Sequence, residues 1–385
     1  MAQVLPADPD EPRAVDGRGG DPGAGPPPPG RTAAGGRRTR VRARLLRDRH
    51  RDQPAPVPAD RGPPRRRTTP RAERAGDVVS RHAGLPDVDV VIATHERPVL
   101  VREAIDAVIG QEYAGRIRCI VVFDRSTPDH ELDRSDSGGR RSVEVIENHR
   151  TPGLAGARNS GVLHGDGEIV AFCDDDDVWL PGKLDRQVRA LCQGGPPTCV
   201  TGIEVDYAGT TTVRVPTAEA LELPNLVRRR VMAAHPSSVV VRRQDLLSAI
   251  GLVDEEIPGS YGEDFDWMIR AAGAGGFHVI AQPLVRVRWG GSKFSRQWAT
   301  IIEAIDYGLA KHPVFREDRR AHARLLGRKA FALAALGDRA AMRCAARTAW
   351  TSPREPRAYL AALVAMRLLS AERLLDIAHR HGHGI

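Results

Sequence analysis

Residues 88–93 are VDVVIA, and this short run of mostly β-branched residues decides the fold class. An apolar run of this length is typical of a strand that is buried on both faces of a parallel sheet. Residues 98–109 begin with a proline and carry apolar side chains at helical spacing, which predicts a helix. The folded part of the chain is therefore expected to open with a strand followed by a helix.

The same alternation continues along the chain. Apolar runs predict further strands at residues 119–123, 143–146 and 169–173, with a helix over about residues 154–164. Strands that alternate with helices build a doubly wound, Rossmann-like α/β sheet. Ligands of such sheets bind beyond the carboxyl ends of the strands, so the residues that follow each strand are the first site candidates.

Carboxylates follow three of the predicted strands. Glu96 comes after the first strand, Asp124 after the second, and residues 174–177 are four consecutive aspartates after the fourth. Four adjacent carboxylates repel one another when the fold holds them together at the edge of the sheet. A bound Mg²⁺ or Mn²⁺ would compensate this charge, because both ions prefer carboxylate oxygens as ligands. In an extended run alternate side chains share a side, so Asp174 and Asp176 are expected to face one site and their two neighbours another.

A second acidic pair, Glu263 and Asp264, precedes apolar residues at helical spacing. The pattern predicts a helix that begins near residue 263, where the helix dipole favours carboxylates. A carboxylate placed there beside a cleft is suited to be a general base, although helix capping alone also accounts for the pair. The single histidine His235, just before another predicted strand at residues 239–241, is expected to be structural.

Five segments in this order resemble the family 2 glycosyltransferases, whose fold is the GT-A fold. They are residues 90–98 (VVIATHERP), 121–126 (VVFDRS), 156–161 (GARNSG), 172–179 (FCDDDDVW) and 262–266 (GEDFD). The resemblance extends from about residue 88 to residue 296, a little over half of the chain. It implies an α/β protein with a mixed GT-A sheet.

The resemblance also implies roles for individual residues. Asp174 and Asp176 match the two acids of the family's DxD motif and would bind Mg²⁺ or Mn²⁺. Asp264 matches the catalytic base, and Glu263 beside it would position the acceptor. The residues expected to bind the donor nucleotide are Thr94, Glu96, Asp124, Arg158, Asp174 and Asp175.

The function implied is metal-dependent, inverting transfer of a sugar from a nucleotide-diphosphate sugar to a hydroxyl group. The acceptor would be a polysaccharide, a glycolipid or a small molecule. Phe123 and Arg125 replace an acid and a glycine that are usual after the second strand, so a UDP-, dTDP- or GDP-linked donor stays open. Residues 286–289 (RVRW) lack the spacing of the (Q/R)xxRW motif of processive members, which favours transfer of a single sugar.

Two other functions stay open. A nucleotidyltransferase also combines a doubly wound sheet with metal-binding acids, but it would need a glycine-rich loop after the first strand, and residues 94–97 (THER) contain no glycine. A non-catalytic nucleotide-sugar-binding protein would not need the intact pair at Glu263 and Asp264.

The composition changes at about residue 84. Residues 1–84 hold 14 of the 29 prolines, 18 of the 57 Lys and Arg residues and 10 of the 49 Asp and Glu residues, which leaves 39 of each sign for residues 85–385. A basic, proline-rich segment of this kind is expected to be disordered. The nearly neutral remainder argues against a nucleic-acid-binding fold, which needs a basic surface.

The domain organisation expected is an extension at residues 1–84, the transferase domain at 85–298 and a C-terminal helical region at 299–385 that packs on that domain or recruits a partner. We expect no signal peptide and no spanning helix, because neither a short apolar leader nor a run of about 18 apolar residues is present. The five cysteines are odd in number and include no CxxC pair, so they indicate neither a zinc knuckle nor a disulfide framework, and a reducing, cytoplasmic location is expected. Peripheral association with the inner face of the membrane is left open.

Overall fold

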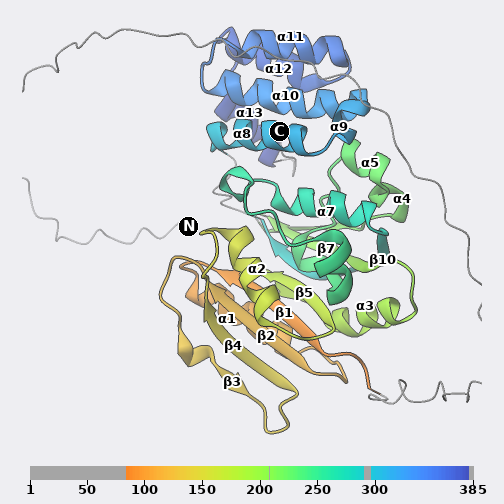
Figure 1. Ribbon diagram of the computed structural model, residues 1–385. Helices are drawn as coiled ribbons and strands as arrows, with labels where there is room; N and C mark the ends of the chain where they lie inside the picture. Colours follow the sequence, from red (N-terminus) through yellow and green to blue (C-terminus); the bar gives the residue numbers. More distant parts are fainter. Residues whose placement is uncertain (1–83, 208, 290–295, 381–385) are drawn as a thin grey trace, which may run out of the picture. The chain divides into compact units, whose positions relative to one another are not determined.

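The computed structural model describes residues 84–207, 209–289 and 296–380 (Figure 1). The predicted extension at residues 1–84 lies outside this part of the chain, apart from Gly84. Ten strands form one mixed sheet in the order β3-β4-β2-β1-β5-β9-β7-β10-β6, with β8 paired to β7. The strands are β1 (Val88–Thr94), β2 (Ile117–Phe123), β3 (Arg134–Ser135), β4 (Arg141–Glu147), β5 (Ile169–Asp174), β6 (Val178–Trp179), β7 (Thr198–Tyr207), β8 (Thr210–Arg214), β9 (Val240–Arg242) and β10 (Phe277–Arg288).

The predicted alternation of strands and helices is confirmed. Strands β4, β2, β1 and β5 run parallel, so their carboxyl ends share one edge of the sheet. Strand β9 lies antiparallel between β5 and β7 and makes the sheet mixed. The helices that accompany the sheet are α1 (Pro98–Ile109), α2 (Leu154–His164), α3 (Lys183–Cys192), α4 (Ala218–Leu221), α5 (Leu223–Arg228), α6 (Arg243–Asp245) and α7 (Glu263–Gly273).

Both faces of the sheet are buried, as the β-branched runs predict. Along β1, Val90 and Ile92 enter one hydrophobic core with α1 and α3, while Val91 and Ala93 enter the other with α2 and α7. Helix α2 lies close to β1 because it has no side chain at Gly161, where a Cβ atom would lie 2.4 Å from a methyl group of Val91. The mixed α/β sheet predicted for a GT-A fold is therefore present.

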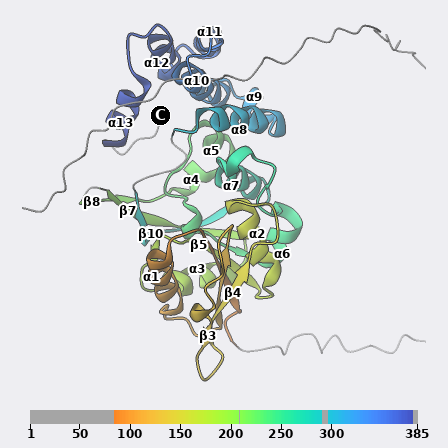
Figure 2. The same cartoon turned by 90° about the vertical axis from the view of Figure 1, so that its left-hand side faces the viewer.

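Six helices follow the sheet in the described part of the chain, as expected of a helical C-terminal region. They are α8 (Trp298–Lys311), α9 (Val314–Glu317), α10 (Arg319–Ala335), α11 (Ala341–Thr351), α12 (Pro356–Ala365) and α13 (Ala371–Arg380). Helices α10, α11 and α12 share a small core of their own, and Figure 2 shows them side by side.

The C-terminal helices also pack on the sheet domain. Ile301, Ile305 and Leu309 of α8 join the hydrophobic core that contains Trp267 and Met268 of α7. The helical region therefore packs on the sheet domain, one of the two uses expected for it, while the domain boundaries at residues 84 and 298 stay predictions. None of the helices among the described residues is long and apolar enough to cross a membrane.

Helix α3 begins with a lysine that is buried in the core. Lys183 is 0% exposed, and its Nζ atom has no hydrogen-bond partner among the described residues. The Nζ atom lies 3.7 Å from the centre of the Trp179 ring, a cation–π contact that compensates only part of the lost hydration. Burial lowers the pKa of Lys183 from 10.5 to about 7.

We expect Lys183→Met to stabilise the protein at pH 7 by roughly 1–3 kcal/mol, because the substitution removes a buried, unpartnered polar group. The folded-state pKa lies below the unfolded one, so the unfolded chain binds more protons between pH 7 and 10.5, and wild-type stability rises with pH across this window. The substitution should abolish this rise. Urea unfolding at several pH values measures both effects.

The matched control is Arg189→Met, which removes an exposed cation from the same helix. It should leave the pH dependence intact. An unchanged pH dependence in Lys183→Met would show that Lys183 is hydrated in solution.

Candidate functional site

The carboxyl ends of β1, β2 and β5 open into a cavity of about 1710 Å³. Its other walls come from the start of α7 and from α8, α10 and α12. Eight of the nine sequence-predicted site residues line this cavity: Thr94, Asp124, Arg158, Asp174, Asp175, Asp176, Glu263 and Asp264.

Glu96 is the predicted residue that the structure does not bring into the cavity. Its side chain is 73% exposed, and its backbone has a positive φ of 54°. Its assignment to the nucleotide pocket stays a prediction. The next residue, Arg97, was not among the sequence-predicted site residues, but it lines the cavity.

Asp124 is buried at the end of β2 and is held in one orientation. Its carboxylate accepts hydrogen bonds from Asn148 Nδ2 at 2.8 Å, the Gly153 backbone at 2.9 Å and Arg125 Nε at 2.7 Å. Burial opposes its ionisation, but these three donors outweigh it and lower the pKa of Asp124. Asp124 is therefore a fixed negative charge at the cavity edge.

The four aspartates form a turn, so the expected alternation along an extended run is wrong. The Asp177 backbone N–H donates to the Asp174 carbonyl oxygen at 3.2 Å, which closes the turn. Because the chain reverses here, the two inner side chains share one side. Asp175 and Asp176 both accept from Arg97 Nη1, at 2.8 and 2.6 Å, and Thr94 Oγ1 donates to Asp175 at 2.8 Å.

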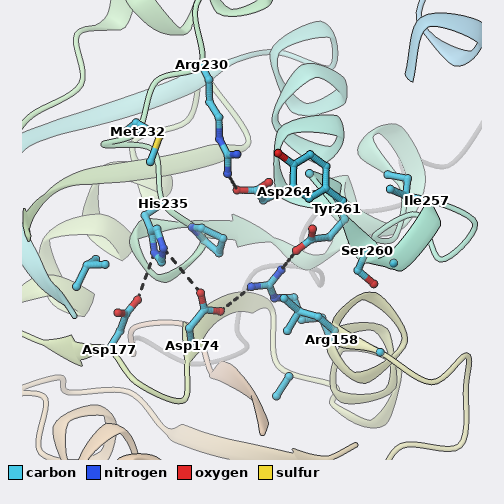
Figure 3. A pocket seen from close by; sticks show the side chains of 18 of the residues that line it. Arg158, Asp174, Asp177, Arg230, Met232, His235, Ile257, Ser260, Tyr261 and Asp264 are labelled. Carbon is cyan, nitrogen blue, oxygen red and sulfur yellow. Dashed lines mark hydrogen bonds and ion pairs between the residues drawn. The ribbon is translucent and has the colours of Figure 1, made fainter. Parts of the chain in front are cut away.

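The two outer aspartates of the turn face His235 (Figure 3). His235 Nδ1 lies 3.2 Å from Asp177 Oδ2, and His235 Nε2 lies 3.9 Å from Asp174 Oδ2. Ser237 connects the same elements, since its hydroxyl donates to Asp177 at 2.5 Å and accepts from the Asp174 backbone at 2.9 Å. His235, expected to be structural, is therefore part of the site.

Asp174, Asp177 and His235 form a group that fits a metal ion. One ligand atom from each lies within 4.8 Å of the others. Burial lowers the pKa of His235, which keeps the imidazole neutral and able to coordinate. Burial also raises the pKa of Asp175, Asp176 and Asp177, so the described residues do not fully compensate the charge of the aspartate turn.

Arg158 of α2 links the two acidic segments of the site. Its Nη2 donates to Asp174 at 2.5 Å and its Nη1 to Glu263 at 2.7 Å, and the residue is only 4% exposed (Figure 3). Burial disfavours the charge on Asp174, yet the charge and the hydrogen bond of Arg158 bring the pKa of Asp174 below its usual value. The end of β5 and the start of α7 are thereby joined through one guanidinium.

The pKa values of the two adjacent acids at the start of α7, Glu263 and Asp264, are shifted in opposite directions. Burial and the neighbouring Asp264 raise the pKa of Glu263 to about 7. Burial acts on Asp264 as well, but its ion pair with Arg230 and the charge of Arg158 lower the pKa of Asp264 (Figure 3). At neutral pH, Asp264 is therefore an ionised carboxylate beside one that holds a proton for part of the time.

The C-terminal helices contribute a basic wall that the sequence analysis missed. Arg324 and Arg328 of α10 and Arg357 of α12 line the cavity together with Arg230. The one signal in the sequence is the spacing of Arg324 and Arg328, which places both on one face of a helix.

Residues 89–245 match the family model described as Glycosyl transferase family 2. This part of the chain belongs to glycosyl transferase family 2. Among curated proteins the chain is 26% identical to the glycosyltransferase AglE of Haloferax volcanii over 195 residues, which cover 50% of this chain and 63% of AglE. It is 29% identical over 115 residues to a GalNAc(5)-diNAcBac-PP-undecaprenol beta-1,3-glucosyltransferase of Campylobacter jejuni, covering 29% of this chain and 36% of that protein.

Solved glycosyltransferase structures resemble the chain more distantly. S. aureus TarS in complex with UDP-GlcNAc matches 77% of this chain and 92% of the TarS chain, at 15% identity and a TM-score of 0.49. The mannosyltransferase PcManGT of Pyrobaculum calidifontis, in complex with GDP-Man and Mn²⁺, matches 75% of this chain and 82% of its own, at 20% identity and a TM-score of 0.44. The chain spans less than two thirds of the length of each of the two curated relatives above.

Proposed function

We propose that this family 2 glycosyltransferase moves one sugar from a nucleotide-diphosphate sugar to an acceptor hydroxyl, with inversion at the anomeric carbon and with Mg²⁺ or Mn²⁺ bound. The observation that carries the proposal is the contact of Arg158 with both Asp174 and Glu263. It holds the strand ends, where the donor is expected, next to the start of α7, where the base is expected. Donor and acceptor thus share one cavity.

The metal is proposed to bind Asp174 and His235 of the group described above, with Asp176, the second acid expected from the sequence, as a ligand in place of Asp177. Asp174 and Asp176 are the two acids that match the DxD motif, and His235 Nε2 faces Asp174. Asp177 is 1% exposed and accepts from Ser237, so it suits a supporting position behind His235. When bound, the metal supplies a Lewis acid for the charge that develops on the leaving diphosphate.

Asp264 is proposed as the general base. An ionised carboxylate at the helix start can take the proton of the acceptor hydroxyl as that oxygen bonds to the anomeric carbon and the bond from this carbon to the diphosphate oxygen breaks. A single displacement of this kind inverts the anomeric configuration. Arg230 holds Asp264 ionised, while Glu263, with its pKa near 7, can donate a hydrogen bond to the acceptor.

We expect Asp264→Asn to reduce turnover by ~10²–10⁴-fold, because it removes the base. Nucleotide binding should stay within about twofold of wild type, since Asp264 belongs to the acceptor side of the cavity. Donor-sugar consumption and calorimetry with the nucleotide measure the two quantities separately.

The control for Asp264→Asn is Glu303→Gln, which removes an exposed carboxyl of α8 outside the cavity. It should keep full turnover. Near-normal turnover of a folded Asp264→Asn protein would refute the assignment of the base.

We expect calorimetry with UDP, GDP and dTDP to find one nucleotide whose binding requires Mn²⁺. Asp176→Asn should abolish the Mn²⁺-dependent part, and His235→Gln should weaken it at least about tenfold, because ligand and supporting residues of metal sites have effects of this size. His130→Gln, which alters an exposed histidine outside the cavity, is the control.

The same titrations distinguish the two neighbours in the turn. If Asp177→Asn abolishes Mn²⁺-dependent binding while Asp176→Asn does not, the metal is held by Asp174, Asp177 and His235 instead. Equal nucleotide binding with and without Mn²⁺ in the wild type would contradict metal dependence altogether.

A further inference from the structure

The basic wall of the cavity has more positive charge than the described residues balance. Arg230 pairs with Asp264, and Arg357 pairs with Glu355 at 2.7 Å. Neither Arg324 nor Arg328 has a carboxylate partner among the described residues. The wall, defined as Arg230, Arg324, Arg328 and Arg357, thus carries four guanidiniums against two carboxylates.

Arg324 and Arg328 are positioned by aromatic rings and neutral oxygens rather than by carboxylates of the described residues. Arg324 lies 5.2 Å from the ring centre of Phe265 and, among the residues that the structure describes, donates only to the Val227 carbonyl oxygen, at 3.4 Å. Arg328 lies 5.6 Å from the ring centre of Tyr261 and donates to its hydroxyl. The Nε atoms of Arg324 and Arg357 are buried with no hydrogen-bond partner in the described part of the chain.

Keeping this arrangement without a ligand is unfavourable. Burial, and then the charges of Arg328, Arg357 and Arg230, lower the pKa of Arg324 to about 9. Burial likewise lowers the pKa of Arg328. Buried donors and charges are costly unless they are paired, and arginine forms its strongest hydrogen bonds with carboxylates and phosphates.

We propose that the basic wall binds a phosphate or diphosphate group of the acceptor. The position of the wall favours the acceptor. Arg328 packs on the ring of Tyr261 and Arg324 on the ring of Phe265, and these two aromatic residues flank Asp264 in the chain. Arg230 forms an ion pair with Asp264 itself. The expected donor residues Asp124 and Asp174 lie instead at the strand ends. An excess of two positive charges matches a phosphate monoester or a diphosphate, and arginine forks suit both.

This inference rests on the proposed function for its meaning, but the anion site itself is tested without an acceptor. The probe is inorganic pyrophosphate in metal-free buffer, titrated into the full-length protein by calorimetry. We expect binding to the wild type and at least about tenfold weaker binding to Arg324→Gln/Arg328→Gln, given the usual strength of hydrogen bonds between charged groups. The matched control is Arg320→Gln, an exposed arginine one turn earlier on α10.

Four further measurements test the proposal. Arg324→Lys/Arg328→Lys keeps the charge, so it should retain part of the binding and serves if the glutamine variant does not fold. Mn²⁺-dependent nucleotide binding should be unchanged in both double variants, and pyrophosphate should still bind when the nucleotide and excess Mn²⁺ already saturate the protein. Pyrophosphate should also raise the thermal midpoint of the wild type more than that of the glutamine variant.

Two results would overturn the proposal. Equal pyrophosphate affinity of wild type and Arg324→Gln/Arg328→Gln would show that the wall is not an anion site. Competition between pyrophosphate and the nucleotide would assign the wall to the donor diphosphate. Failure of the proposed function is recognised separately, by the absence of Mn²⁺-dependent nucleotide binding while the pyrophosphate result stands.

Discussion

The site depends on one buried guanidinium. Arg158 comes from α2, directly behind the strand ends, and contacts an acid of β5 and an acid of α7. Removing one partner of a buried ion pair typically costs about 3–5 kcal/mol, because the other charge is left uncompensated. Without Arg158, Asp174 and Glu263 would face each other as buried carboxyls, and the start of α7 would lose its fixed position over the sheet.

The charge of the cavity is divided between two walls. The strand ends and the aspartate turn carry Asp124, Asp174, Asp175, Asp176 and Asp177, and the basic wall carries Arg230, Arg324, Arg328 and Arg357. A cation on the acidic wall and an anion on the basic wall would each relieve a local excess. Asp264 lies at the boundary, where Arg230 keeps it ionised. This division gives the C-terminal helices a chemical role in addition to their packing on the core.

The sequence could predict which residues follow the strands, and these residues do meet. The ends of parallel strands share an edge, so Thr94, Asp124 and Asp174 needed only a correct assignment of three strands. The direction of each aspartate side chain could not be predicted, because it depends on the hydrogen bond between Asp177 N and the Asp174 carbonyl oxygen. His235 lies at the site because the neighbouring Ser237 hydrogen-bonds to Asp174 and Asp177, and Arg324 and Arg328 lie there because α10 packs beside the cavity. These are contacts between distant parts of the chain, which no local sequence pattern predicts. An arginine pair at helical spacing is equally typical of an exposed helix face.

The measurement that tests the account most directly is a crystal structure of the protein with Mn²⁺ and the nucleoside diphosphate that it binds. We expect the anomalous signal of Mn²⁺ between Asp174 and His235, the nucleotide at the ends of β1, β2 and β5, and Asp264 open to the rest of the cavity beside the basic wall. A nucleotide bound away from the strand ends, or Mn²⁺ bound without contact to Asp174, would contradict the assignment of this cavity as the site of glycosyl transfer.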